Sequence, residues 1–161
     1  SLGIPTGTIT IDPPAQPSQP GQAKGEPVVG GSVMFKGRAA DLIAPGLPGR
    51  PWHALVSCPY EEVETPERVH VDPYGHVQVC QGISIGNVWE RPVGEIVTDH
   101  RAADHPICGP LVEGGPQELA SALGFAPDDR YVDECHLCFE TRRSLLDRFP
   151  KELAPAQVYG R

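Results

Sequence analysis

The sequence predicts a small, loop-rich α+β domain in which a β-hairpin is followed by about three short helices. Three observations lead to this fold class. Of the 161 residues, 19 are proline and 18 are glycine, which favours turns and short elements. Residues 68–80 alternate apolar and polar side chains on both sides of a turn motif. Three later segments carry apolar residues at helical spacing, between residues that typically start and stop helices.

Length and charge restrict the classes of protein that the sequence fits. A chain of 161 residues suits one domain, or one domain with a tail. The net charge of −8 and the lack of a dense basic run disfavour nucleic-acid binding. No run approaches the roughly 20 apolar residues that cross a bilayer, and the start lacks a signal-peptide pattern. We therefore expect a cytoplasmic protein without nucleic-acid or membrane partners. The first residue, Ser1, fits a fragment of a longer polypeptide.

Residues 1–50 predict a Pro/Gly-rich arm or linker with short strands. Residues 7–12 alternate like a short strand, and the Pro/Gln-rich residues 13–20 have almost nothing to bury, so a disordered tail is an equal alternative. A second short strand is expected at residues 33–36. A helical turn is expected at residues 38–43, before several prolines and glycines end it.

A strand and a β-hairpin are predicted next along the chain. Residues 54–58 (ALVSC) predict a short buried strand that ends at a cysteine. Residues 68–80 predict a β-hairpin whose turn is the segment DPYG. In that turn Asp72 can bond the turn backbone, and Pro73 fixes the first central position. The outgoing strand delivers Cys80 to its end.

After the hairpin, Gly82 and residues 86–87 predict a loop. We expect three helices, over residues 92–103, 116–123 and 134–149. Gly124 is the expected C-cap of the second helix, and Asp133 is the expected N-cap of the third.

The cysteines carry the strongest chemical signal. Their odd number, five, favours metal or catalytic use over disulfides. Cys135 and Cys138 lie three residues apart at a predicted helix N-terminus, which places both sulfurs on one face and favours the thiolate form. Cys58, Cys80 and Cys108 are the candidates for further ligands, and spacing alone does not choose among them. Residues 51–161 are thus predicted to be a cysteine-rich metal-binding domain.

Several chemistries are open to these residues. The pair Cys135 and Cys138 fits half of a zinc site, two ligands of an iron–sulfur cluster, or a redox dithiol. The dithiol is least favoured because no βαβ pattern surrounds the pair. A cysteine–histidine enzyme, with His105 or His136 as the base, is disfavoured because catalytic partners are usually distant in sequence. The acidic residues at 61, 62 and 64 predict a solvated loop.

The sequence GHVQVC at residues 75–80 resembles the Gly-x4-Cys element of the SPASM and twitch auxiliary domains of radical S-adenosylmethionine enzymes. The turn GNV at residues 86–88 and the following helix are also similar to that family. The resemblance covers roughly residues 52–149. It implies an α+β domain that holds a [4Fe–4S] cluster, with Cys58 as the upstream ligand and Cys108 as the spare cysteine. Five cysteines suit one cluster, as in a twitch domain, and not the two of a full SPASM domain.

The resemblance also implies a partner. No Cys-x3-Cys-x2-Cys motif occurs in the chain, so the radical-generating barrel would lie upstream in the same polypeptide or in another protein. The cluster would serve electron transfer, substrate positioning or structural support, and no complete catalytic site is visible in the chain itself. The alternative is a structural Zn²⁺-binding domain that mediates protein interaction, because zinc uses the same thiolate ligands and stabilises small domains.

Overall fold

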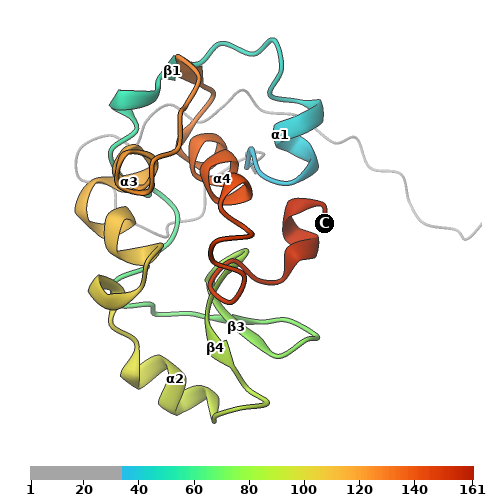
Figure 1. The fold of residues 1–161 in the computed structure, drawn as a ribbon, viewed down its shortest axis with the longest axis vertical. Coiled ribbons are helices and arrows are strands. Elements are labelled where there is room, and N and C mark those ends of the chain that lie inside the picture. Colours follow the sequence, from blue (N-terminus) through green and yellow to red (C-terminus); the bar gives the residue numbers. More distant parts are fainter. Residues whose placement is uncertain (1–33) are drawn as a thin grey trace, which may run out of the picture.

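Helices and antiparallel strands are both present in the computed structural model, which describes residues 34–161 (Figure 1). The chain is therefore an α+β protein, as the sequence predicts. In the view of Figure 1, strands β3 and β4 lie below α3 and α4, and α2 extends at the lower end. The two segments predicted at residues 7–12 and 13–20 lie outside the described residues. None of the described helices has the length and apolar character that crossing a membrane requires.

The main sheet has three antiparallel strands in the order β2-β3-β4. They are β2 (His70–Val71), β3 (His76–Cys80) and β4 (Ile83–Asn87). The predicted hairpin is confirmed, and the Asp72 carboxylate accepts hydrogen bonds from the backbone N–H groups of Tyr74 and His76 at 2.8 and 3.1 Å. The prediction of a loop after the hairpin was wrong, because Ile83 is fully buried and its segment pairs with β3.

A second, two-stranded sheet pairs β1 (Arg50–Pro51) with β5 (Arg130–Tyr131). The 3-10 turn η1 (Trp52–Ala54) follows β1 directly. The prediction of a strand at residues 54–58 was wrong. The Leu55 N–H donates back to the Trp52 carbonyl at 3.2 Å, and the Leu55 carbonyl accepts from the Gln117 N–H at 3.0 Å. These bonds tie the segment to a helix and leave no ladder for a neighbouring strand.

The described helical elements are α1 (Arg38–Leu42), α2 (Val93–Asp99), η2 (Ala102–Asp104), α3 (Cys108–Leu123), α4 (Glu134–Ser144) and η3 (Ala156–Tyr159). The predicted helical turn near residue 40 is confirmed by α1. The expected helix at residues 92–103 is shorter, because the chain turns at His100 (ψ 129°), whose Nε2 donates to the Val63 carbonyl at 3.0 Å. The helix expected to end at residue 149 ends at Ser144, where Leu145 leaves helical geometry (ψ 3°).

Helix α3 begins earlier than the sequence predicts. Its second half matches the expected helix and ends at Gly124, which caps it in the left-handed conformation (φ 74°). A first half, which starts at Cys108, precedes a kink at Gly114 and Gly115. Cys108 is therefore the first residue of a helix that the sequence does not predict.

Residues 34–44 pack against the helical part of the fold. Phe35 and Ala44 form a small buried cluster with Val132, and Ala40 belongs to the main core. Residues 34–36 are not a strand, contrary to expectation, and residue 33 lies outside the described residues. The division of the chain at residue 50 stays a prediction.

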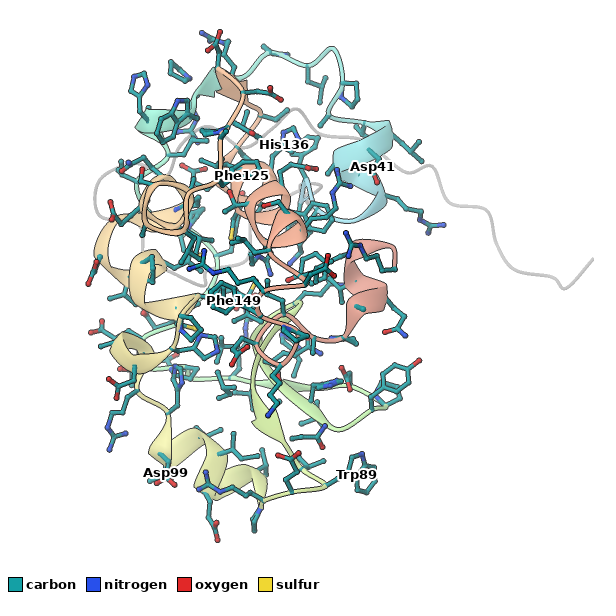
Figure 2. The ribbon with its side chains drawn as sticks, viewed as in Figure 1. Asp41, Trp89, Asp99, Phe125, His136 and Phe149 are labelled. Atoms are coloured by element: carbon teal, nitrogen blue, oxygen red, sulfur yellow. The ribbon has the colours of Figure 1, made fainter. Side chains whose placement is uncertain are left out.

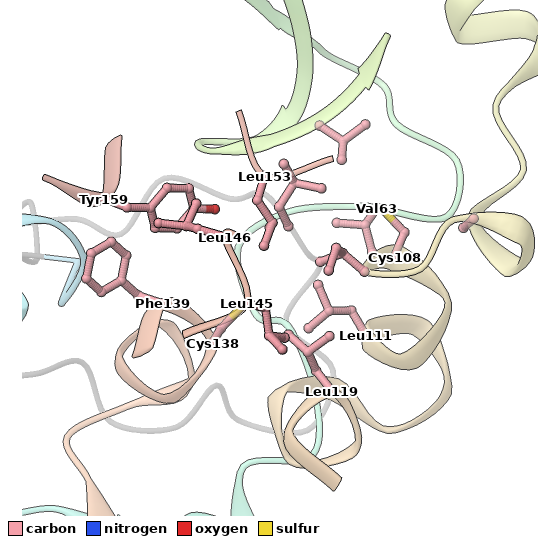
Figure 3. Close-up of a cluster of buried hydrophobic side chains, with 14 of the residues drawn as sticks. Val63, Cys108, Leu111, Leu119, Cys138, Phe139, Leu145, Leu146, Leu153 and Tyr159 are labelled. Carbon is pink, nitrogen blue, oxygen red and sulfur yellow. The ribbon is translucent and has the colours of Figure 1, made fainter. Parts of the chain in front are cut away.

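The main core lies where the sheet meets α3, α4 and the C-terminal segment (Figure 3). Its fully buried members include Ile83, Ile107, Cys108 and Leu119, and Phe139 stacks on Tyr159 with ring centroids 5.6 Å apart. A smaller cluster beside it joins Leu55 and Leu137. Figure 2 shows Trp89, an exposed side chain, at the far end of the sheet from His136 and α4. The two cores thus fix α3 and α4 against each other and against the end of β3.

Candidate metal centre

Four of the five cysteines line one small pocket with a volume of about 20 Å³. They are Cys58, Cys80, Cys135 and Cys138, and Cys108 is not among the lining residues. Every cysteine is a free thiol. In the described part of the chain, no three His, Cys, Asp or Glu side chains form a ready-made group that could hold a metal ion. The structure therefore gathers four of the predicted ligands around one space and leaves the fifth apart.

Cys135 and Cys138 enter the pocket from the first turn of α4. The predicted N-cap is confirmed, since the Asp133 carboxylate accepts from the His136 backbone N–H at 2.8 Å. Cys138 is buried as part of the core, and Cys135 is partly exposed. The capped first turn holds the two side chains on one face of the helix, as their spacing predicts.

Cys80 reaches the pocket at the end of β3, where a tight turn leads into β4. The Gly82 N–H donates to the Gln78 side-chain oxygen at 2.6 Å, which closes this turn from within the sheet. The carbonyl groups of Gln81 and Gly82 accept hydrogen bonds from side chains of α4 and η3. Contacts from two other elements thus hold the residues next to Cys80.

Cys58 follows a loop that crosses α3 at its kink. Gly115 occupies a conformation that is essentially restricted to glycine (φ 67°, ψ −157°). A side chain at this position would overlap the backbone of Val56 and Ser57. The close approach therefore depends on glycine and fixes the path of the chain immediately before Cys58.

Cys108 occupies a different environment, at the start of α3 within the main core. Its side chain is fully buried, and Figure 3 shows it in the cluster with Val63 and Leu111. The His105 Nδ1 accepts from the Cys108 backbone N–H at 3.1 Å, and its Nε2 donates to the Ser84 carbonyl at 3.0 Å. The His105 ring is therefore occupied in capping α3, and it contacts the Cys108 backbone instead of activating the thiol.

Burial raises the pKa of several thiols. It raises the pKa of Cys58 to about 11, and the neighbouring Cys80 adds to this rise while backbone hydrogen bonds from Glu61 and Tyr60 oppose it. Burial, with Cys80 and Cys138 nearby, raises the pKa of Cys108 to about 12. Burial also raises the pKa of Cys135 and of Cys138. These thiols are protonated at neutral pH in the metal-free chain, so binding a metal must release protons.

Arg142 is a buried cation that lines the same pocket. Only 1% of its surface is exposed. Burial raises the pKa of the Cys138 thiol, and the Arg142 guanidinium opposes that rise through its charge and a hydrogen bond. Sequence reasoning missed this residue. The signal was available, because Cys135, Cys138 and Arg142 follow i, i+3, i+7 spacing and so share one helix face.

Two glutamates and a lysine complete the polar lining. Glu61 is 9% exposed and pairs with Arg68 at 3.2 Å, so the expectation of a solvated loop was wrong at this position. Glu134 pairs with Arg50 at 2.6 Å. Burial raises the pKa of the Cys135 and Cys138 thiols, and the positive charge of Lys36 partly lowers it again. Both glutamates thus have arginine partners.

His136, the second histidine considered as a ligand or base, does not line the pocket. Its Nδ1 accepts from the Val132 backbone N–H at 3.3 Å, and its ring meets Tyr131 edge-on with centroids 5.1 Å apart. The structure therefore gives neither predicted histidine a place beside the gathered cysteines.

No protein-family model, curated protein or solved structure matches this chain. The case for a metal centre therefore rests on the residues themselves. Four thiols around one pocket are the donor set of a four-cysteine zinc site and also of an iron–sulfur cluster. A buried guanidinium beside them suits the net negative charge that either group would carry. By donor chemistry, the residues fit both groups.

Proposed function

We propose that the chain binds a [4Fe–4S] cluster through Cys58, Cys80, Cys135 and Cys138. The observation that carries this proposal is that these four side chains line one pocket while Cys108 lies outside it. The same four residues remain when Cys108 is taken as the spare cysteine, as the resemblance to the SPASM and twitch domains implies. The pocket lining and the resemblance thus support the same set of proposed ligands.

Donor chemistry alone does not separate this cluster from zinc. Four thiolates bind either group, and both complexes carry a net negative charge that Arg142 would balance. The Gly-x4-Cys element at residues 75–80, which the structure forms as the outgoing strand of a hairpin, favours the iron–sulfur cluster. Zinc is therefore an outcome of the test below and not a second proposal.

The proposed role is that of an auxiliary cluster in a cytoplasmic radical S-adenosylmethionine protein. When bound, such a cluster supplies electron transfer or structural support, and four cysteine ligands favour these roles over binding of substrate to an open iron. The chain itself would hold the thiols on α4, on β3 and in the loop before Pro59. Leu111 and Pro116 would keep the pocket apolar. The catalytic barrel would be upstream in the same polypeptide or in another protein.

The test is a metal and sulfide analysis of the chain expressed in iron-replete medium and purified without oxygen. We expect iron and acid-labile sulfide in about equal amounts, near four of each per chain. Stoichiometric zinc without iron uptake would contradict the proposal. Anaerobic handling is essential, because vacant thiolates readily take up zinc after a cluster is lost.

The isolated chain should also fail to cleave S-adenosylmethionine under reducing conditions, because it lacks the three-cysteine motif. The measurement is chromatography for 5′-deoxyadenosine, with an active radical enzyme as the positive control. Product above background from the isolated chain would contradict the assignment to an auxiliary domain.

A further inference from the structure

The Arg142 guanidinium is buried at the cysteine pocket without a carboxylate partner in the described residues. Three of its hydrogen bonds go to uncharged oxygens: Nε donates to the Cys138 carbonyl at 3.2 Å, and Nη1 donates to the Gln81 carbonyl at 2.9 Å and the Tyr159 hydroxyl at 3.1 Å. None of the ion pairs within residues 34–161 includes it. A buried charge is costly unless an opposite charge lies nearby.

The next residue shows that carboxylates are available on this helix. Arg143 is partly exposed and pairs with Asp41 at 2.6 Å and with Glu140 at 2.7 Å. Arg142 points to the other side of α4, where it shares the pocket lining with the four cysteines. The two carboxylates that line this pocket, Glu61 and Glu134, pair with Arg68 and Arg50. The thiols can also become anionic, and Cys138 lies one helical turn from Arg142.

Three elements hold the Arg142 side chain in place. It is rooted in α4, it contacts the turn after β3 through Gln81, and it contacts η3 through Tyr159. The Tyr159 hydroxyl in turn donates to the Gly82 carbonyl at 2.6 Å, and its ring stacks on Phe139. The guanidinium is therefore a fixed charge and not a mobile surface group.

We infer that Arg142 raises the reduction potential of the cluster, an inference that rests on the proposed function. Reduction adds one electron, and with it one negative charge, to the cluster and its thiolates. A fixed cation in a poorly solvated site stabilises that added charge more strongly than the same cation would in water. Lys36 also lines the pocket but is only half-buried, so solvent screens its charge more and its contribution is smaller.

The experiment compares Arg142→Met and Arg142→Lys in the full chain after anaerobic reconstitution with iron and sulfide. Midpoint potentials are measured by dye-mediated titration followed by electron paramagnetic resonance. For Arg142→Met we expect the equilibrium constant for reduction to fall at least about tenfold, which is about 59 mV for a one-electron couple. Arg142→Lys keeps the charge and should stay within about threefold of the wild type.

Tyr159→Phe is the matched control, because it removes a hydrogen-bond partner of Arg142 and keeps the ring and the positive charge. Its potential should remain near that of the wild type. A shift as large as that of Arg142→Met would assign the effect to packing and overturn the inference. An unchanged potential in Arg142→Met that still holds its cluster would also overturn it.

If Arg142→Met does not keep the cluster, the inference is tested by comparing the cluster content of Arg142→Met and Arg142→Lys. Loss in Arg142→Met with retention in Arg142→Lys supports a requirement for positive charge. Loss in both variants would show a purely structural role and would overturn the inference. If the wild-type chain takes up no iron and sulfide, the proposed function itself fails before any potential is measured.

Discussion

The N-termini of α3 and α4 present the same residue type in two different surroundings. Cys108 opens α3, and Cys135 and Cys138 are the second and fifth residues of α4. Both helix starts are capped by a side chain, His105 at α3 and Asp133 at α4. Cys108 and Cys138 both belong to the main hydrophobic core, but only Cys138, with Cys135, also lines the pocket that holds two further cysteines.

This difference shows that a cysteine at a helix N-terminus is not by itself a ligand. A helix terminus by itself favours the thiolate, but burial raises the pKa of the thiols at both helix starts. Cys135 and Cys138 line one pocket with Cys58, Cys80 and Arg142, whereas Cys108 does not line it, although the charges of these groups also act on its thiol. The two helix starts therefore form an internal comparison in which changes at α4 should affect metal binding and matched changes at α3 should affect stability alone.

The largest expected effect comes from replacing a cysteine at each helix start. Cys138→Ser should abolish iron and sulfide binding and lower the melting temperature of the reconstituted protein by about 10 °C or more, because ligand binding no longer stabilises the fold. Cys108→Ala should keep full metal content and lose about 1 kcal/mol of stability through a small core cavity. Metal analysis and thermal unfolding measure both. Full iron content in Cys138→Ser would remove the distinction between the two helices.

The next effect concerns the loop that brings Cys58 to the pocket. Gly115→Ala forces a side chain into the backbone of Val56 and Ser57 and into a conformation that favours glycine. We expect a loss of about 3 to 5 kcal/mol and weaker metal retention. Urea unfolding and iron content measure these changes.

Gly124→Ala is the matched control at the C-terminal end of the same helix. Gly124 also has positive φ, but nothing lies within 4 Å of the position of an added Cβ. The expected cost is about 1 to 2 kcal/mol, with metal content unchanged. Equal costs for the two variants would show that the close approach at Gly115 does not matter.

A rise in pH is expected to have a smaller effect on the stability of the metal-free chain. The pKa of Cys58 in the folded chain is about 11, above its ordinary value, so the unfolded chain loses this proton first as pH rises. The stability that the buried neutral thiol contributes is complete below about pH 9 and is lost as pH rises through about 11. The melting temperature of the metal-free chain should therefore fall in this window.

The metal-loaded protein supplies the control for this prediction. Its ligating thiols have already released their protons, so its melting temperature should change less between pH 9 and 11 than that of the metal-free chain. The difference between the two forms removes the contribution of lysines and tyrosines, which titrate in both. Parallel curves would indicate that the thiols are not the ligands.

The smallest expected effect comes from removing the side chains that cap α4 and α3, Asp133 and His105. Asp133→Ala and His105→Ala each remove an acceptor for helix N-terminal N–H groups and should cost about 1 kcal/mol. Only Asp133→Ala loosens the turn that holds two proposed ligands, so only it should weaken metal retention in competition with a chelator. Equal retention in both variants would place the control of metal binding outside the first turn of α4.

Elements that depend on local chemistry follow directly from the sequence. Asp72 bonds the hairpin turn, Gly124 ends α3, and Asp133 caps α4, each through residues a few positions away. Strand β4 and the first half of α3 depend on distant partners instead. Glycine and proline near them indicate a loop, but burial of Ile83 and Leu111 in the core overrides that preference.

The candidate site divides in the same way. The spacing of Cys135 and Cys138 within one helical turn predicts their shared face without any tertiary information. The approach of Cys58 and Cys80 requires the crossing at Gly115 and the turn after β3, which no short motif encodes. The core position of Cys108 likewise depends on a helix half that its Gly/Pro-rich sequence does not predict.

Anomalous X-ray diffraction from crystals grown without oxygen would test the central claim most directly. Data collected on both sides of the iron and zinc absorption edges identify the metal and locate it in the fold. The account predicts iron density in contact with the sulfurs of Cys58, Cys80, Cys135 and Cys138, and none beside Cys108. Density that appears only at the zinc edge, or iron bound away from these four sulfurs, would contradict it.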